Sequence, residues 1–233
     1  MPFGSWLPDE LAHAGAEHLD PDFAEGYDRK QGSAAETAAV EDVEVLSAHG
    51  VGADATVVDL GAGTGRFAVS LAPRVRRVVA VDVSPAMLEV LRGRAAGHGN
   101  IEVVEAGLLT YEHRGQPAAA VHSRNVLHQL PDVWKALALR RMFHMLRPGG
   151  VLRLRDLVYD FAPADADEVI EAWLDNAATD PASGYTREDL SAHVRGEHST
   201  FSWLLEPMLE QAGFDIVEVS SARTYGAYTC LRR

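Results

Sequence analysis

Strands and helices alternate along most of the chain, judging by the spacing of its apolar and polar residues. Short apolar runs bounded by turns predict strands at about 56–60, 77–82, 101–105, 118–123, 150–158, 214–221 and 225–231. Apolar residues three or four positions apart predict helices at about 64–72, 85–96 and 131–145. This alternation is typical of the doubly wound α/β class, in which helices cover both faces of a parallel sheet.

Two helical regions lie outside that alternation. Residues 1–50 contain a segment with Asp9 as a candidate N-cap and an alanine-rich amphipathic stretch at 34–49. Residues 163–212 contain three helical patterns and no strand signal, and they separate the fifth strand from the sixth. We expect this second region to form a lid, and we expect residues 1–233 to form a single domain.

A glycine-rich turn follows the first strand. In the segment 57–66, two valines lead into Asp59, and glycines then occupy positions 61, 63 and 65, where a missing Cβ lets a ligand approach the backbone. The next strand ends in Asp82, where a carboxylate can accept hydrogen bonds from both hydroxyls of a ribose. Together these features predict a site for a cofactor that contains a nucleoside.

The details of the turn favour a cofactor without phosphate. The dinucleotide fingerprint G-x-G-x-x-G has its third glycine one position later than Gly65, where this chain has Arg66. Pyrophosphate prefers helix N–H groups with no carboxylate close by, so Asp59 is a poor neighbour for it but a good one for an ammonium group. A ribose, an amino-acid end and no phosphate describe S-adenosylmethionine (SAM).

Four segments resemble the class I SAM-dependent methyltransferases. Residues 57–68 and 78–92 are similar to motifs I and II of that family, residues 125–132 to its "LHHLPD" segment, and residues 145–152 to its "LkPGG" turn. The resemblance implies a seven-stranded, mostly parallel sheet with an antiparallel seventh strand, N-terminal helices that cover the cofactor, and a helical lid between strands five and six. It also implies methyl transfer from SAM to a small-molecule acceptor, with S-adenosylhomocysteine (SAH) as product.

The resemblance places the cofactor at the ends of the first four strands. The cofactor contacts that it implies are Asp59, Gly61, Gly63, Asp82, Val83, Met87, Gly107, Leu108, Ser123 and Asn125. Helix capping by Asp59 and core packing by Met87 are the alternatives. Gly107 stands where the family commonly has an Asp that meets the adenine amino group. Adenine recognition therefore rests on the backbone of Gly107 and Leu108, or on an acid supplied by another residue.

The sequence offers fewer candidate residues for the methyl-acceptor site than for the cofactor site. His128 stands where the family often has a His, and it is either catalytic or structural. Arg155 lies near the end of the fifth strand, where it would hold an anionic group or pair with an acid. The expected substrate contacts are Tyr27, Arg155, His198 and Trp203. The histidines have no metal-ligand spacing and Cys230 is the single cysteine, so no metal site is expected.

Charge and composition exclude several classes of binding partner and cellular location. The net charge of −13 argues against nucleic acid and against a membrane surface, which leaves a small molecule as the partner. No apolar run approaches the ~20 residues that span a bilayer, and the N-terminus does not resemble a signal peptide. With one cysteine, a cytoplasmic enzyme is expected, and a homodimer stays open.

Three other functions fit the same residues, and in one of them the chain is a noncatalytic subunit whose lid is an interaction surface. The chain could bind SAM without methylating, as a cyclase or a regulatory module. It could also be an NAD-dependent oxidoreductase, which the position of Gly65 disfavours.

Overall fold

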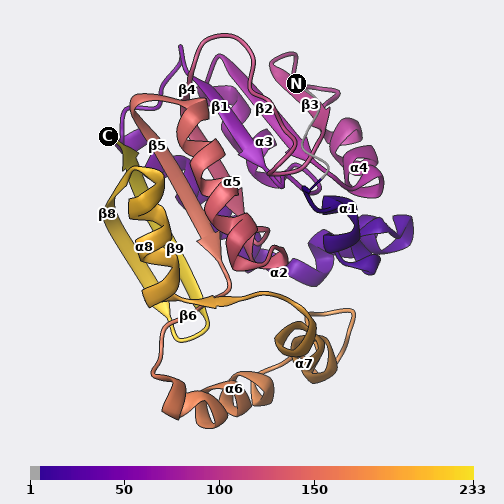
Figure 1. The fold of residues 1–233 in the computed structure, drawn as a ribbon. Helices are drawn as coiled ribbons and strands as arrows, with labels where there is room; N and C mark the ends of the chain where they lie inside the picture. The colour runs from indigo at the N-terminus through magenta and orange to yellow at the C-terminus, as the bar shows by residue number, and fades with distance from the viewer. Residues whose placement is uncertain (1–5) are drawn as a thin grey trace.

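A seven-stranded sheet forms the centre of the computed structural model, which describes residues 6–233 (Figure 1). Its strands are β1 (Thr56–Leu60), β2 (Arg77–Asp82), β3 (Ile101–Glu105), β4 (Ala118–Arg124), β5 (Leu146–Asp156), β8 (Phe214–Ala222) and β9 (Tyr225–Arg232). They lie in the order β3-β2-β1-β4-β5-β9-β8. The strands from β3 to β5 are parallel, and β9 is antiparallel to both of its neighbours. The predicted mostly parallel sheet with an antiparallel last strand is confirmed.

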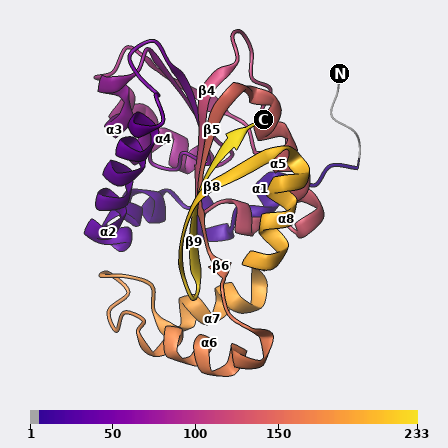
Figure 2. The ribbon, with the colours of Figure 1, turned by 90° about the vertical axis from the view of Figure 1, so that its left-hand side faces the viewer.

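Helices cover both faces of the sheet (Figure 2). On one face lie α2 (Pro21–Ala48), α3 (Arg66–Leu71) and α4 (Pro85–Ala95), and on the other lie α5 (Asp132–Met145) and α8 (Ser202–Ala212). Successive side chains of a strand point to opposite faces. Val57 of β1 therefore packs in the core beneath α2 and α3, and Val58 packs in the core beneath α5.

The N-terminal region is helical, as expected, but it is divided differently. It consists of α1 (Glu10–His13), a 3₁₀ turn (Ala16–Leu19) and the long α2. Asp20 caps α2, with Pro21 in its first turn, and both favour a helix start there. Gly32 interrupts α2 with a φ of 65°, so the stretch predicted at 34–49 is the second half of α2.

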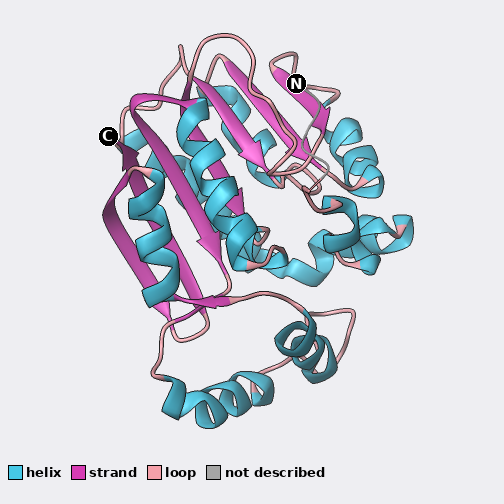
Figure 3. Ribbon diagram, in the orientation of Figure 1, coloured by secondary structure: helices cyan, strands magenta, loops and turns pink. Residues whose placement is uncertain are grey.

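A lid extends beyond the carboxyl ends of the strands (Figure 3). It contains α6 (Ala166–Asp175) and α7 (Arg187–Gly196), and we use the term lid for residues 160–199. The lid predicted at 163–212 differs in two respects. A short strand, β7 (Thr200–Phe201), pairs with β6 (Val158–Tyr159). In addition, α8 packs on α5 and β8, because its apolar face joins the central core.

Candidate functional site

Two adjoining hollows open at the carboxyl ends of β1, β2 and β4, where open α/β sheets bind ligands. The first has a volume of about 660 Å³, and eight predicted cofactor contacts line it, namely Gly61, Gly63, Asp82, Val83, Met87, Gly107, Leu108 and Asn125. The second has a volume of about 550 Å³ and includes Asp59. Tyr27 and Arg124 line both hollows, and together we call them the cleft.

The glycine-rich turn shapes the floor of the cleft. Gly61 has a φ of 74°, and a Cβ built on it would lie 2.1 Å from a methyl carbon of Val126. Gly63 has a φ of 53°, and a Cβ there would meet nothing within 4 Å among the described residues. Gly61 is therefore required by packing, whereas Gly63 leaves its backbone open to a ligand.

Asp82 holds the turn and α4 in place. Its Oδ2 accepts a hydrogen bond of 2.7 Å from the Gly63 amide, and its Oδ1 accepts one of 2.9 Å from the Ser84 amide. Burial raises the pKa of the Asp82 carboxyl. Ser84 caps α4 through its own hydroxyl. Each Asp82 oxygen keeps a lone pair for a further donor in the cleft.

An acid from the N-terminal segment lies at the end of β3. Glu10 of α1 accepts hydrogen bonds from the Leu109 amide at 2.9 Å and from the Thr110 hydroxyl at 3.0 Å. A Cβ built on Gly107 would lie 2.3 Å from the Glu10 carboxyl carbon. Glu10 is 8% exposed and lines the first hollow. It brings a carboxylate to the strand end at which the sequence has Gly107.

Asp59 is part of a buried charge network. Its Oδ1 lies 2.7 Å from His122 Nδ1, and His122 Nε2 lies 3.3 Å from Asp42 Oδ2. Hydrogen bonds with Asp42 and Asp59 outweigh the effect of burial and raise the pKa of His122. The second oxygen, Asp59 Oδ2, is buried and has no hydrogen-bond partner within residues 6–233. One face of this carboxylate is therefore available to a ligand.

Arg155, predicted as a substrate contact, belongs to the same network. Its Nε lies 2.7 Å from Asp42 Oδ1, and its guanidinium also pairs with Glu41 at 2.8 Å. Arg153, the neighbour on that face of β5, binds Asp42 at 2.6 Å, as expected for a buried arginine. Arg155 lines a separate hollow between α2 and β8. The structure therefore corrects its assignment from substrate contact to ion-pair partner.

The end of β4 carries two further predicted contacts. Ser123 is fully buried, and its hydroxyl has no hydrogen-bond partner in the described part of the chain. Asn125 has a φ of 55° and lines both hollows. Its side-chain oxygen accepts a hydrogen bond of 2.9 Å from the Tyr225 hydroxyl, which orients the amide at the strand end.

His128 has partners that come from three places in the chain. Its Nδ1 is hydrogen-bonded to Asp156 at the end of β5, and its Nε2 lies 2.9 Å from Glu197 Oε2. His193 Nδ1 lies 2.9 Å from the same oxygen. Against the effect of burial, Asp156 and Glu197 raise the pKa of His128 to about 9.

The two remaining predicted acceptor contacts lie at the edge of the lid. The His198 amide donates to the His128 carbonyl at 2.8 Å, and the His198 ring contacts that of His13, which lines the first hollow. Trp203 is 54% exposed and stacks on Phe201 at the start of α8. His198 is therefore near the cleft, whereas Trp203 faces solvent.

Several residues at the site were not predicted from the sequence. Glu10 and Arg124 line the cleft, and Asp156, His193 and Glu197 surround His128. The spacing of His193 and Glu197, four residues apart at the end of α7, was the signal available for part of this set. The other contacts depend on tertiary structure.

Comparison with known proteins relates the central part of the chain to a family. Residues 57–150 match the family model described as a methyltransferase domain. The chain therefore contains a methyltransferase domain, and it shares its fold with SAM-dependent methyltransferases of known structure. The chain is 27% identical over 204 residues to the ubiquinone/menaquinone biosynthesis C-methyltransferase UbiE of Proteus mirabilis, a match that covers 81% of this chain and 76% of the relative.

Two further matches differ in extent. A malonyl-[acyl-carrier protein] O-methyltransferase of Serratia marcescens is 34% identical over 124 residues, which cover 50% of this chain and 42% of that protein. The chain spans less than half the length of several of the relatives that it matches. The structure of magnesium protoporphyrin IX methyltransferase (ChlM) from Synechocystis PCC 6803 with bound SAH has a TM-score of 0.63 at 17% identity. That match covers 85% of this chain and 84% of ChlM, and it shows a common fold.

Proposed function

We propose that this protein binds SAM in the cleft and transfers its methyl group to a small-molecule acceptor. The observation that carries the proposal is the unpaired Oδ2 of Asp59, a buried carboxylate oxygen beside the open backbone of Gly63. A buried carboxylate oxygen without a partner is costly. The ammonium group of SAM would provide the missing donor and a compensating charge.

The rest of the cleft fits the remaining parts of SAM. Asp82 has lone pairs for the two ribose hydroxyls, and Val83 and Met87 provide an apolar wall for the adenine. Glu10 is placed to accept a hydrogen bond from the adenine amino group, next to Gly107.

The contribution of the chain to catalysis is binding, orientation and exclusion of water. When bound, SAM supplies a methyl group on a positively charged sulfur, and SAH remains after transfer. Asp59 holds the amino-acid end of the cofactor and Asp82 holds its ribose, while Tyr27 and α1 cover it. Holding both reactants in attack geometry can contribute on the order of 7–11 kcal/mol. His128 is 7% exposed and enclosed by Asp156 and Glu197, so we assign it no proton transfer.

A small molecule is the acceptor class that the features support. The net charge of −13 disfavours nucleic acids. The similar proteins UbiE and ChlM are methyltransferases of ubiquinone/menaquinone biosynthesis and of magnesium protoporphyrin IX. We propose that the acceptor enters between the cleft and the lid. Tyr27 in the cleft and His198 beside His13 are the proposed contacts.

The location and assembly are also proposals. Within residues 6–233, no helix has the length and apolar character of a membrane span. A cytoplasmic location is supported by Cys230, which is buried and unpaired. A homodimer is supported by the exposed Val217 and Val219 on β8, an edge strand of the sheet. Light scattering during size-exclusion chromatography measures the assembly.

Calorimetric titration tests the proposed function. We expect SAM and SAH to bind with micromolar affinity, about −8 kcal/mol. The variant Asp82→Asn should weaken SAM binding at least about tenfold, because a hydrogen bond to a charged acceptor contributes roughly 1.5–3 kcal/mol. The control Glu89→Gln, at an exposed site on α4, should bind like the wild type. Heat with NADH but none with SAM or SAH would overturn the proposal.

A further inference from the structure

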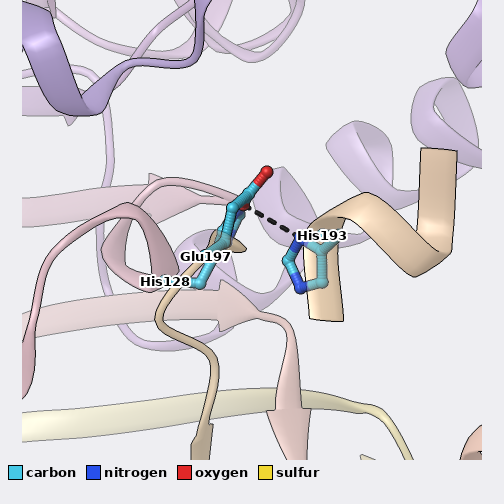
Figure 4. Close-up of side chains that lie close together, drawn as sticks. All are labelled: His128, His193 and Glu197. Carbon is cyan, nitrogen blue, oxygen red and sulfur yellow. Dashed lines mark ion pairs between the residues drawn. The ribbon is translucent and has the colours of Figure 1, made fainter. Parts of the chain in front are cut away.

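Three potential metal ligands converge where the lid meets the core (Figure 4). His128 lies in the 3₁₀ turn Leu127–Gln129 after β4, while His193 and Glu197 come from the end of α7. One atom from each of the three side chains lies within 4.8 Å of the other two. The side chains of His128 and His193 are 8% and 10% exposed, and that of Glu197 is 31% exposed.

The outer side of each imidazole ring is held by another residue. Asp156 is hydrogen-bonded to His128 Nδ1, which leaves Nε2 facing the centre of the cluster. Ser199 Oγ lies 2.8 Å from His193 Nε2, which leaves Nδ1 facing the centre. Histidines that bind metals are usually oriented in this way, with the second nitrogen bonded to a carboxylate or another polar group.

The two inner contacts of the cluster have the distances of hydrogen bonds but not their geometry. Both inward nitrogens lie 2.9 Å from Glu197 Oε2. That oxygen is buried, yet it has no hydrogen bond of acceptable geometry to any described residue. Ligand atoms at about 2.1 Å from an ion lie roughly 3 Å apart in octahedral geometry and roughly 3.4 Å apart in tetrahedral geometry. The two separations, together with the misaligned N–H directions, are therefore compatible with adjacent ligands of one ion.

We propose that His128, His193 and Glu197 bind one divalent transition-metal ion and thereby fasten α7 to the core. Two imidazole nitrogens and one carboxylate oxygen suit Zn²⁺, Co²⁺ or Fe²⁺, whereas Mg²⁺ and Ca²⁺ prefer oxygen ligands. Binding joins segments that are far apart in the sequence. Three protein ligands leave at least one coordination position for water or another small ligand.

The site is separate from the cofactor cleft. Gln129 and Leu130, which follow His128 in the chain, line the first hollow, whereas His128 itself contacts the lid. Metal binding can be measured without SAM. Failure of the metal proposal therefore leaves the methyltransferase proposal intact, and the reverse also holds.

The test uses tag-free, full-length protein freed of metal with a chelator. Zn²⁺ is titrated by calorimetry, and Co²⁺ is titrated by visible absorption, which reports nitrogen ligation directly. We expect one ion per chain with a micromolar or lower dissociation constant. His193→Ala and Glu197→Ala should each weaken binding at least about tenfold, the effect of losing roughly 1.4 kcal/mol. The control His98→Ala removes the imidazole of a histidine in the turn that follows α4. It should leave metal binding unchanged.

Both lid variants keep the buried His128 ring in place, and circular dichroism and SAM titration check that each variant is folded. Absence of a Co²⁺ absorption band and of stoichiometric Zn²⁺ binding in the wild type would overturn the proposal. Equal metal binding by wild type, His193→Ala and Glu197→Ala would also overturn it. Either result would identify the cluster as an ion pair between His128 and its two carboxylates.

Discussion

At the level of single residues, Glu10 changes the expected account of adenine recognition. The family resemblance implies an Asp after the third strand, and the chain has Gly107 there. Glu10 of α1 lies against that glycine, and a Cβ at position 107 would collide with it. The missing side chain at 107 and the carboxylate at 10 therefore belong together. We therefore propose that Glu10, a residue of α1, supplies the acid that the end of β3 lacks.

We expect Glu10→Gln to weaken SAM binding. The amide can still accept from Leu109, but it lacks the charge that strengthens a hydrogen bond from the adenine amino group. The loss should be about 3- to 30-fold, on the scale of one charge-assisted hydrogen bond. Calorimetry with SAM measures it, with Glu89→Gln as the matched exposed control. Unchanged affinity in Glu10→Gln would assign Glu10 a purely structural role in holding Leu109 and Thr110.

The sequence predicts some site residues far better than others. Asp59, Gly63 and Asp82 lie in strand–turn patterns whose geometry is local, so their positions at the strand ends follow from the alternation of the fold. Glu10 and Glu197 reach their sites only through tertiary packing, because each comes from a helix far from its partner in the sequence. Periodicity along the chain carries no information about such contacts.

At the level of elements, α2 is attached to the sheet through one carboxylate. Asp42 is fully buried and binds Arg153 and Arg155 of β5, and it also contacts His122 of β4. Hydrogen bonds and charges of these partners hold the pKa of Asp42 well below its usual range, despite the opposing effect of burial. Loss of this one side chain would leave two arginines without their shared partner.

We expect Asp42→Ala to destabilise the protein by about 3–5 kcal/mol, the cost of breaking a buried ion pair from one side. For a chain of this size that corresponds to a fall in melting temperature of roughly 6–20 °C. Glu41→Ala is the matched control, because Glu41 is exposed and pairs with the same Arg155. The control should cost less than about 1 kcal/mol. Thermal melts of both variants, monitored by circular dichroism, make the comparison; equal melting temperatures would contradict this account.

The position of α8 illustrates what the spacing of apolar residues in the sequence cannot predict. The three helical patterns predicted within residues 163–212 agree with α6, α7 and α8, but apolar spacing does not say which surface the apolar face of α8 covers. The structure places α8 on α5 and β8, so this helix belongs to the core and not to the lid. β6 and β7 contain two residues each, which is too short for a period of two to be recognised.

At the level of the whole molecule, a chain of buried charges connects the N-terminal cover with the cofactor cleft. It runs from Arg155 and Asp42 through His122 to Asp59, which lines the second hollow of the cleft. Phe67 stacks on the His122 ring with centroids 3.6 Å apart, which keeps the imidazole in the plane that joins the two carboxylates. The protonation of His122 therefore affects both stability and the position of Asp59.

The pH dependence of stability follows from the signs of these shifts. The folded-state pKa of His122 is raised, so its stabilising contribution is complete below about pH 6.5 and is lost as the pH rises through the folded-state value. The pKa of Asp42 is lowered, so its contribution is present above about pH 4 and is lost as the pH falls. We therefore expect the melting temperature to be highest between these limits and to decline on the alkaline side.

In His122→Asn, which keeps a polar side chain but does not titrate, the decline of the melting temperature at alkaline pH should be shallower than in the wild type. Melts of both proteins at a series of pH values, with chelator present, measure the difference. If the melting temperatures of both proteins fell equally with pH on the alkaline side, His122 would be neutral in the folded protein. Asp59 would then have no charged partner at His122.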